Sequence, residues 1–384
     1  MNDLERHETI FPFGCNVSSK SRTRFCKGKG PEWITSGSGP YVRGSDDRDY
    51  LDLTAGLGAL TLGHRDDEWF MRCPQAYPLP HRNELDLAEY IQEIIPRAES
   101  MRFCKNGGDA TMAAVRLARI YTGRDRIVDF GNYHGCQDSW ITIEHEGVPQ
   151  CIRDLTVRAK PDINTLPWVN DTVACVILEA LPLNPLPDGF LVALRARCTA
   201  VGAVLIFDDV ISGFRAHPQG AAGVTGVIPD LTCAGKAMAN RFPISMVYGK
   251  AEIMKCWERT HLSATHWADP TCMSAAMSTI YTMEQEGFWE KQAAWTFGGM
   301  KHNGYWSVTA LDPVDQTYVQ SHLLDAGIIT NFSQFFYLDL MPHKAFIEQA
   351  FTDAFGKLAD AKQRGSDIAS LLDCEVNRTL FKRN

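Results

Sequence analysis

The stretch Leu205-Ile206-Phe207-Asp208-Asp209-Val210 is an apolar run that ends in two acids. Residues 203–207 predict a strand, and nearly unbroken apolar runs are typical of strands buried on both faces of a parallel sheet. Adjacent side chains point to opposite sides of a strand, so only one of the acids can face a ligand. We expect this to be Asp208, with Val210 following on the same side. Taken alone, one such carboxylate is equally a solvated strand-end acid or a metal ligand.

A lysine gives Asp208 a possible partner. Lys236 ends the segment Pro229-Asp230-Leu231-Thr232-Cys233-Ala234-Gly235-Lys236, a short apolar run followed by a small residue and an amine. A lysine in a loop is usually solvated. A lysine amine together with a strand-end carboxylate, however, is what pyridoxal 5'-phosphate chemistry needs. The amine forms a Schiff base with the aldehyde, and the carboxylate keeps the pyridine nitrogen protonated so that the ring accepts electrons.

The surrounding pattern alternates strands and helices. Strands are predicted at 126–130, 173–178, 203–207 and 244–248, the last three as buried parallel strands, and helices at 109–121 (ending at Gly123), 190–200 and 272–286. This alternation is typical of a doubly wound α/β domain with helices on both faces of a mostly parallel sheet. A strand at 335–338 and a helix at 343–363 predict a small α+β terminal domain. We expect an N-terminal arm (1–48), a large domain (49–285) and a small domain (286–384) joined by part of the N-terminal segment.

Composition narrows the class of protein. The chain has 384 residues, which is more than one hydrophobic core usually serves, and its formal net charge of −8 argues against a general nucleic-acid footprint. The N-terminus is charged rather than apolar, and no uncharged apolar stretch reaches the ~20 residues that span a bilayer. The twelve cysteines form no CxxC pair, so we expect reduced core thiols and no metal site. We expect a soluble cytoplasmic protein.

Two loops are candidate ligand sites. Asn106-Gly107-Gly108-Asp109 leads into the first predicted helix, where backbone N–H groups and the helix dipole favour a phosphate. The plainer interpretation is a strand-to-helix turn in which Asp109 complements the dipole. Tyr133 and His134 lie between glycines just past a predicted strand end, where α/β sheets bind ligands. An aromatic ring there can stack on a planar cofactor, although a lone tyrosine is more often a packing residue.

One glycine-rich segment suggests a different enzyme. Residues 51–60 are similar to the glycine loop of S-adenosylmethionine-dependent methyltransferases. Those enzymes usually place an acid at the end of the next strand to hold the ribose hydroxyls. Here the chain continues into a proline-rich stretch with Pro74, Pro78 and Pro80 instead. The methyltransferase interpretation is therefore the weaker one.

Across residues 35–285 the chain resembles the class-III, fold-type I pyridoxal phosphate-dependent aminotransferases, and among them the glutamate-1-semialdehyde aminomutase-like branch. The segments that carry the resemblance occur in family order: 52–64, 102–124, the Tyr-His-Gly turn at 131–135, Phe207 to Arg215, and Pro229 to Lys236. This ordered set is far more specific than any one motif. The resemblance implies a fold-type I transferase with a large α/β domain and a small α+β domain.

The resemblance also implies a role for each motif residue. Lys236 would hold the cofactor as a Schiff base and shuttle a proton, and Asp208 would bind the pyridinium nitrogen. Tyr133 and Val210 would cover the two ring faces. Together Lys236, Asp208 and Tyr133 form the implied catalytic set.

The remaining implied contacts concern the phosphate group. Asn106, Gly107 and Gly108 would cradle it, and His134 belongs to the implied cofactor-binding turn. Thr265 would reach the phosphate of a neighbouring subunit, which makes the active site a property of a homodimer.

The chain departs from the family pattern at several positions. The phosphate loop lacks the two hydroxyl residues usual there, Asp209 replaces a glutamate, and Glu179 is followed by Ala180 where proline is usual. The segment from 287 to 318 is shorter than the usual small domain by tens of residues. We therefore expect an unusual substrate pocket, and no arginine stands out as a carboxylate clamp, with Arg82 and Arg241 candidates by position only.

The functional hypothesis is pyridoxal 5'-phosphate-dependent transfer of an amino group on a small amino or keto substrate, by an aminotransferase or aminomutase. The same electron sink supports decarboxylation or racemisation, because the bond perpendicular to the ring is the one that breaks. A decarboxylase or isomerase is thus the alternative within this cofactor class. A non-catalytic descendant that keeps the fold is the alternative of another class, and retention of the three implied catalytic residues argues against it.

Overall fold

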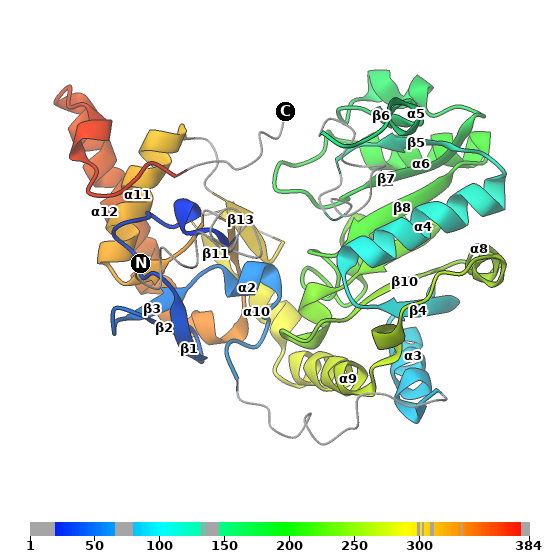
Figure 1. Ribbon diagram of the computed structural model, residues 1–384, viewed down its shortest axis with the longest axis horizontal. Helices are drawn as coiled ribbons and strands as arrows, with labels where there is room; N and C mark the ends of the chain where they lie inside the picture. Colours follow the sequence, from blue (N-terminus) through cyan, green and yellow to red (C-terminus); the bar gives the residue numbers. More distant parts are fainter. Residues whose placement is uncertain are drawn as a thin grey trace. The chain divides into compact units, whose positions relative to one another are not determined.

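The computed structural model describes residues 20–65, 80–131, 134, 146–297, 300–301, 303–307, 311–331 and 333–377. The described residues pack as two compact units (Figure 1). One unit combines the residues before 67 with those after 290, and the other contains residues 67–290. The domain boundaries at residues 48 and 285 that we expect from the sequence describe functional domains rather than these units, and they stay a prediction.

The second unit is built on a seven-stranded sheet. Its order is β4 (Ser100–Cys104), β10 (Ser245–Gly249), β9 (Leu231–Ala234), β8 (Val204–Asp209), β7 (Val173–Leu178), β5 (Arg126–Asp129) and β6 (Thr156–Arg158). The five strands from β9 to β6 are parallel to one another, and β10 runs antiparallel to both β9 and β4. The α/β fold with a mostly parallel sheet is therefore confirmed.

The direction of one strand differs from the prediction. The apolar run at 244–248 was expected to be a buried parallel strand, but β10 is antiparallel. All five of its residues are buried. An apolar run reports burial on both faces and carries no information about direction, which explains the difference.

Helices cover both faces of this sheet. On one face, α4 (Gly107–Thr122) packs on alternate strand residues such as Cys175, Ile177 and Ile206. On the other face, α6 (Phe190–Val201) packs on Val176, Leu178, Leu205 and Phe207. On the same face, α3 (Arg82–Ile94) and α9 (Pro270–Gln285) pack on β10. Figure 1 shows α4 lying across the sheet. The shorter helices are α5 (Gln150–Arg153), α7 (Gly220–Thr225) and α8 (Ala251–Met254), and α10 (Phe288–Ala294) spans the boundary between the two units.

The ends of α4 follow from its sequence. Asp109 closes the first turn, because its carboxylate accepts the backbone N–H of Asn106 at 3.0 Å. Gly123 ends the helix in a left-handed conformation (φ 66°), which glycine adopts without a Cβ penalty. The predicted helix at 109–121 and its stop are confirmed.

The first unit has an α+β architecture. Its main sheet has the order β1 (Ile34–Ser38), β2 (Tyr41–Gly44), β3 (Asp49–Asp52) and β14 (Ile328–Ile329), so chain segments far apart in sequence pair side by side. Two small sheets, β11 (Thr296–Phe297) with β12 (Met300–Lys301) and β13 (Tyr305–Ser307) with β15 (Ser333–Phe335), and the helices α2 (Ala55–Gly58), α11 (Pro313–Asp325) and α12 (Lys344–Gln363) complete it. The helix predicted at 343–363 is confirmed. The strand predicted at 335–338 ends at Phe335, and a 3-10 helix begins at Leu338.

The glycine-rich segment at 51–60 belongs to this unit. β3 lies between antiparallel β2 and parallel β14, outside the seven-stranded sheet. This placement removes the basis for the methyltransferase interpretation, which needs the segment to follow the first strand of a parallel sheet. In the part of the chain that the structure describes, no helix is both long and apolar enough to cross a bilayer.

Candidate active site

Lys236 lies at the end of β9, and the start of that strand is firmly held. The buried carboxylate of Asp230 accepts hydrogen bonds from the Leu205 backbone N–H and from Arg195, both at 2.8 Å, and pairs with Lys250 at 2.7 Å. Burial acts to raise the pKa of Asp230, but these donors outweigh it and the net shift is downward. The carboxylate therefore stays charged and locks β8 against β9, so that the two strand ends carrying Asp208 and Lys236 are held in register.

The backbone turns sharply at Lys236. This residue has φ 41°, in the left-handed region that side chains other than glycine rarely adopt. It begins a 3-10 helix, Lys236–Ala239. Such a conformation costs free energy and persists only where the surrounding structure imposes it. The surrounding structure therefore holds Lys236 in this strained conformation, as is common for residues at functional sites.

A hydrogen-bonded chain joins Lys236 to Asp208 through His134. The Lys236 Nζ lies 2.8 Å from His134 Nε2, and His134 Nδ1 lies 3.1 Å from both carboxylate oxygens of Asp208. Asp208 is buried, and its Oδ1 also accepts the backbone N–H of Val210 at 3.1 Å. The sequence predicted that Lys236 and Asp208 lie together, and the structure brings them to the two sides of one imidazole ring.

The neighbouring acid, Asp209, bonds a different set of residues from Asp208. Asp209 accepts hydrogen bonds from the Ser212 hydroxyl at 2.9 Å and from the Ala221 backbone N–H at 2.8 Å. Burial raises the pKa of Asp209 to about 6, against the lowering effect of these two donors. The two adjacent acids therefore have separate sets of partners, as expected for strand residues of opposite orientation.

The predicted phosphate loop packs directly against the predicted ring-face residue. A Cβ added at Gly107 would lie 2.6 and 2.8 Å from the two methyl carbons of Val210, so only glycine fits there. Asn106 precedes the helix, and its carbonyl accepts the Ser245 hydroxyl at 2.6 Å. Ser245 also lies beside Gly235, whose added Cβ would meet the Ser245 Cβ at 3.2 Å. Ser245 thus connects the phosphate loop to the lysine turn.

The turn that carries His134 is anchored by residues to which the sequence motifs gave no role. Asp129, at the end of β5, is fully buried, pairs with Arg158 at 2.8 Å, and accepts the Gly131 backbone N–H at 2.8 Å. The Glu179 backbone N–H donates to the Gly131 carbonyl at 3.0 Å, and its carboxylate lies 3.7 Å from His134 Nδ1. The sequence motifs gave Ser245, Asp129 and Glu179 no role in the site, because their contacts join strands that are distant in sequence.

The structure gives the positions of three of the four remaining predicted residues. Tyr133 lies outside the described residues. Thr265 is exposed and begins the 3-10 helix Thr265–Ala268 beside β4. Arg82 pairs with Asp86 at 2.6 Å on the surface, and Arg241 stacks on the Phe242 ring.

The donor set fits pyridoxal 5'-phosphate. It offers an amine at Lys236, a buried carboxylate at Asp208, and a helix N-terminus at Gly107 that approaches without a side chain. His134, Glu179 and Asp208 also bring three possible metal ligands within 4.8 Å of one another. The Lys236 amine on the same imidazole favours the cofactor over a cation, because like charges repel.

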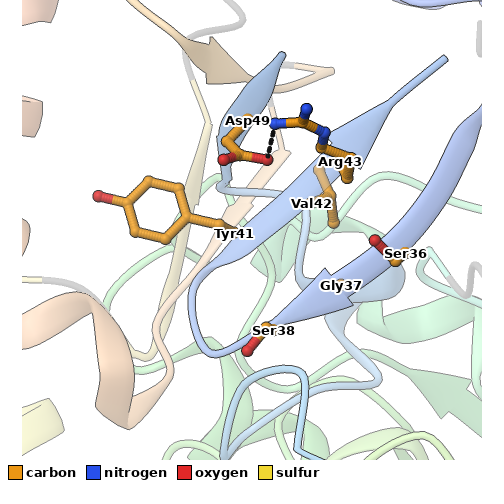
Figure 2. A pocket seen from close by; sticks show the side chains of 7 residues that line it. All are labelled: Ser36, Gly37, Ser38, Tyr41, Val42, Arg43 and Asp49. Carbon is orange, nitrogen blue, oxygen red and sulfur yellow. Dashed lines mark hydrogen bonds and ion pairs between the residues drawn. The ribbon is translucent and has the colours of Figure 1, made fainter. Parts of the chain in front are cut away.

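A surface hollow lies in the first unit, away from these motifs in sequence. It measures about 370 Å³ and is formed by β1, β2 and the start of β3 (Figure 2). Arg43 in its lining pairs with Asp49 at 3.1 Å. The lining contains no predicted site residue, so we assign it no chemistry.

Comparison with known proteins agrees with the site. The family model for class-III aminotransferases matches residues 27–297. The chain is 34% identical to the glutamate-1-semialdehyde 2,1-aminomutase of Legionella pneumophila (strain Lens) over 328 residues, which cover 76% of this chain and 75% of that protein.

Solved structures show the same fold. An omega-transaminase from Sphaerobacter thermophilus is similar with a TM-score of 0.81 and 25% identity, over 94% of this chain and 97% of that one. The FumI protein of Sphingopyxis sp. MTA144, solved in its PLP internal aldimine form, is similar with a TM-score of 0.83 and 22% identity, over 97% of each chain. The chain belongs to the class-III aminotransferase family and is a pyridoxal 5'-phosphate-dependent enzyme.

Proposed function

We propose that this enzyme moves an amino group on a small amino or keto substrate, with Lys236, Asp208 and His134 at the reaction centre. The observation that carries the proposal is the continuous contact from the Lys236 amine through His134 to the buried Asp208 carboxylate. Gly107, at the N-terminus of α4, packs against the Val210 side chain beside this chain of contacts. Family membership independently supports amino-group transfer.

Pyridoxal phosphate, when bound, supplies an electron sink that stabilises negative charge on the substrate carbon. Lys236 would hold the cofactor through its amine, and Asp208 would hold the pyridine nitrogen. The phosphate would lie against Asn106, Gly107 and Gly108, and Val210 would cover one ring face. Tyr133 is proposed for the other face.

The residues of this chain also account for proton movement. The Lys236 Nζ would accept a proton from the substrate carbon and pass it to a carbon of the cofactor, which is general acid–base catalysis by an amine. His134 Nδ1 lies 3.1 Å from both oxygens of Asp208, and together with the Val210 N–H this contact holds the carboxylate in one orientation. Because Asp208 is buried, a negative charge on it would be poorly screened and would act strongly on a pyridine nitrogen bound beside it.

Amine-donor screening tests the proposal and separates its two forms. The protein loaded with pyridoxal phosphate is mixed with single amino donors, and absorbance at about 410–430 nm is followed. An aminotransferase loses the band and releases one keto or aldehyde product per site. An aminomutase turns over a single substrate into its positional isomer without a second partner. If no donor changes the spectrum and the only product is carbon dioxide or a racemised substrate, amino-group transfer is refuted.

We also propose that the active site is completed across a homodimer, with Thr265 serving the partner's phosphate site. Its exposed position in the short helix beside β4 supports this, because the side chain is available to a second subunit. Mixing Thr265→Ala protein with Lys236→Ala protein is the test, since only a mixed dimer would contain one intact site. Recovery of activity is expected, and no recovery despite proven subunit exchange would refute the shared site. A cytoplasmic location stays a prediction.

A further inference from the structure

Two cysteines from opposite ends of the chain meet in the first unit. Cys26 is fully buried, and its Sγ lies 3.7 Å from the Thr317 carbonyl in α11. Cys374 is partly buried and packs against the same cluster. The residues that follow them, Lys27 and Glu375, are joined by a backbone hydrogen bond, so the two cysteines lie on neighbouring chain segments. The pair is separate from the Lys236 site, and its fate does not depend on the proposed function.

The backbone around both cysteines is held in place. The Glu375 N–H donates to the Lys27 carbonyl at 3.0 Å, and the Cys26 N–H donates to the Asn377 side chain at 3.0 Å. The Asn377 N–H in turn donates to the Thr317 hydroxyl at 2.9 Å. The first two bonds join the segment of Cys26 to the segment of Cys374, and the third ties the Cys374 segment to α11, so the two segments are held together without needing a contact between the thiols.

The surroundings of the two thiols shift their pKa values in opposite directions. The Lys29 ammonium lies 2.9 Å from both Asp325 and Asp373 and is mostly buried. The hydrogen bond from Cys26 lowers the pKa of the Cys374 thiol, and the Lys29 charge adds to this against the effects of burial and Asp373. The hydrogen bond to Cys374 and burial raise the pKa of Cys26. Cys374 is thus the thiol more easily ionised and more accessible, while Cys26 is shielded from solvent.

We propose that Cys26 and Cys374 are a redox-active pair that hydrogen peroxide converts into an intramolecular disulfide. In the first step the Cys374 sulfur attacks a peroxide oxygen, so that an S–O bond forms, the O–O bond breaks, and the departing oxygen leaves as water after taking up a proton. In the second step Cys26 loses its proton and attacks the Cys374 sulfur, so that the S–S bond forms and a second water leaves. Two thiols are oxidised by two electrons, and one peroxide is reduced to two waters.

The cross-link would close nearly the whole chain into one loop. A bond between residues 26 and 374 restricts the unfolded chain far more than the folded one, because the two cysteines already lie on neighbouring segments in the folded state. The oxidised protein is therefore expected to unfold at a higher temperature than the reduced protein. Reduction by a dithiol should restore the lower temperature.

Peptide mapping after hydrogen peroxide treatment is the direct test. The full-length protein is reduced, treated with a small excess of peroxide, alkylated and digested with trypsin. The expected product is Phe25–Lys27 joined to Gly365–Arg378, formed in the folded protein with the loss of two of its twelve thiols. In Cys26→Ser the Cys374 sulfenic acid should persist and react with dimedone, because nothing resolves it. Cys151→Ser is the matched control, since Cys151 is exposed and its removal should leave the cross-link unchanged.

The outcomes are distinct. The linked peptide in wild type and in Cys151→Ser, its absence in Cys374→Ser, and a raised unfolding temperature support the proposal. A Cys374 that is oxidised without linking to Cys26, or that links to another cysteine instead, overturns it. The wild-type map decides even if a serine variant fails to fold.

Discussion

Replacing Gly107 with alanine tests the packing between the phosphate loop and the ring-face residue. The new methyl carbon would lie 2.6 and 2.8 Å from the two Val210 methyl carbons, whereas unstrained carbon contacts are about 3.5–4.0 Å. Val210 is buried and cannot swing into solvent. Either the valine or the N-terminus of α4 must shift by roughly 1 Å.

The size of the effect follows from two opposing terms. Overpacking costs about 1–3 kcal/mol, and alanine favours a helix over glycine by about 0.5–1 kcal/mol. The expected result is a net loss of about 1 kcal/mol, within a range of about 0–2.5 kcal/mol, in the free energy of unfolding, together with weaker retention of pyridoxal phosphate. Urea titration measures the first quantity, and cofactor titration followed by absorbance measures the second.

Two further variants make the reasoning refutable. Val210→Ala removes both clashing methyl groups, so the double variant should lose about 1–2 kcal/mol less than the sum of the two single variants. Gly356→Ala is the matched control, because an added Cβ in α12 meets nothing within 4 Å and should stabilise the protein by about 0.5–1 kcal/mol. If Gly107→Ala is as benign as Gly356→Ala, or if Val210→Ala brings no relief, the packing argument is wrong.

Two other predictions concern buried carboxylates. The folded-state pKa of Asp209 is raised to about 6 from 3.8, so its contribution to stability is complete below about pH 4 and is lost as pH rises through 6. Relative to Asp209→Asn, the wild-type protein should lose up to about 3 kcal/mol of unfolding free energy between pH 4 and 7, measured by urea titration at each pH. A constant difference between the two proteins across this range would contradict the assignment. Arg158→Ala should cost about 2–3 kcal/mol, because it leaves the buried Asp129 carboxylate without its cation, and adding Asp129→Asn should recover part of the loss in the same assay. Equal stability of Arg158→Ala and the double variant would show that the ion pair has no such role.

Local patterns in the sequence predicted much of the fold. The strand at 173–178 has the predicted bounds because six consecutive apolar residues are buried on both faces. The stop at Gly123 follows from the left-handed conformation that glycine favours. The opposite orientation of Asp208 and Asp209 follows from the period of a strand. Each of these features depends on neighbours in sequence.

Features that depend on distant contacts were not predictable in the same way. The antiparallel direction of β10 has no local signal, because burial alone determines its apolar character. The support of the His134 turn by Asp129 and Arg158 joins two strands, and neither residue belongs to a recognisable motif. The position of Ser245 between the phosphate loop and the lysine turn depends on the pairing of β10 with β4 and β9. The individual roles of the predicted site residues stay predictions until they are tested.

The attachment point of the cofactor tests the central claim most directly. Protein loaded with pyridoxal phosphate is reduced with borohydride, digested, and mapped by mass spectrometry, with Lys236→Ala treated in parallel. The account predicts an absorbance band near ~410–430 nm that borohydride removes, with the reduced pyridoxyl group on Lys236 and no label in the variant. A label on another lysine, or a wild-type protein that takes up no pyridoxal phosphate, would contradict it.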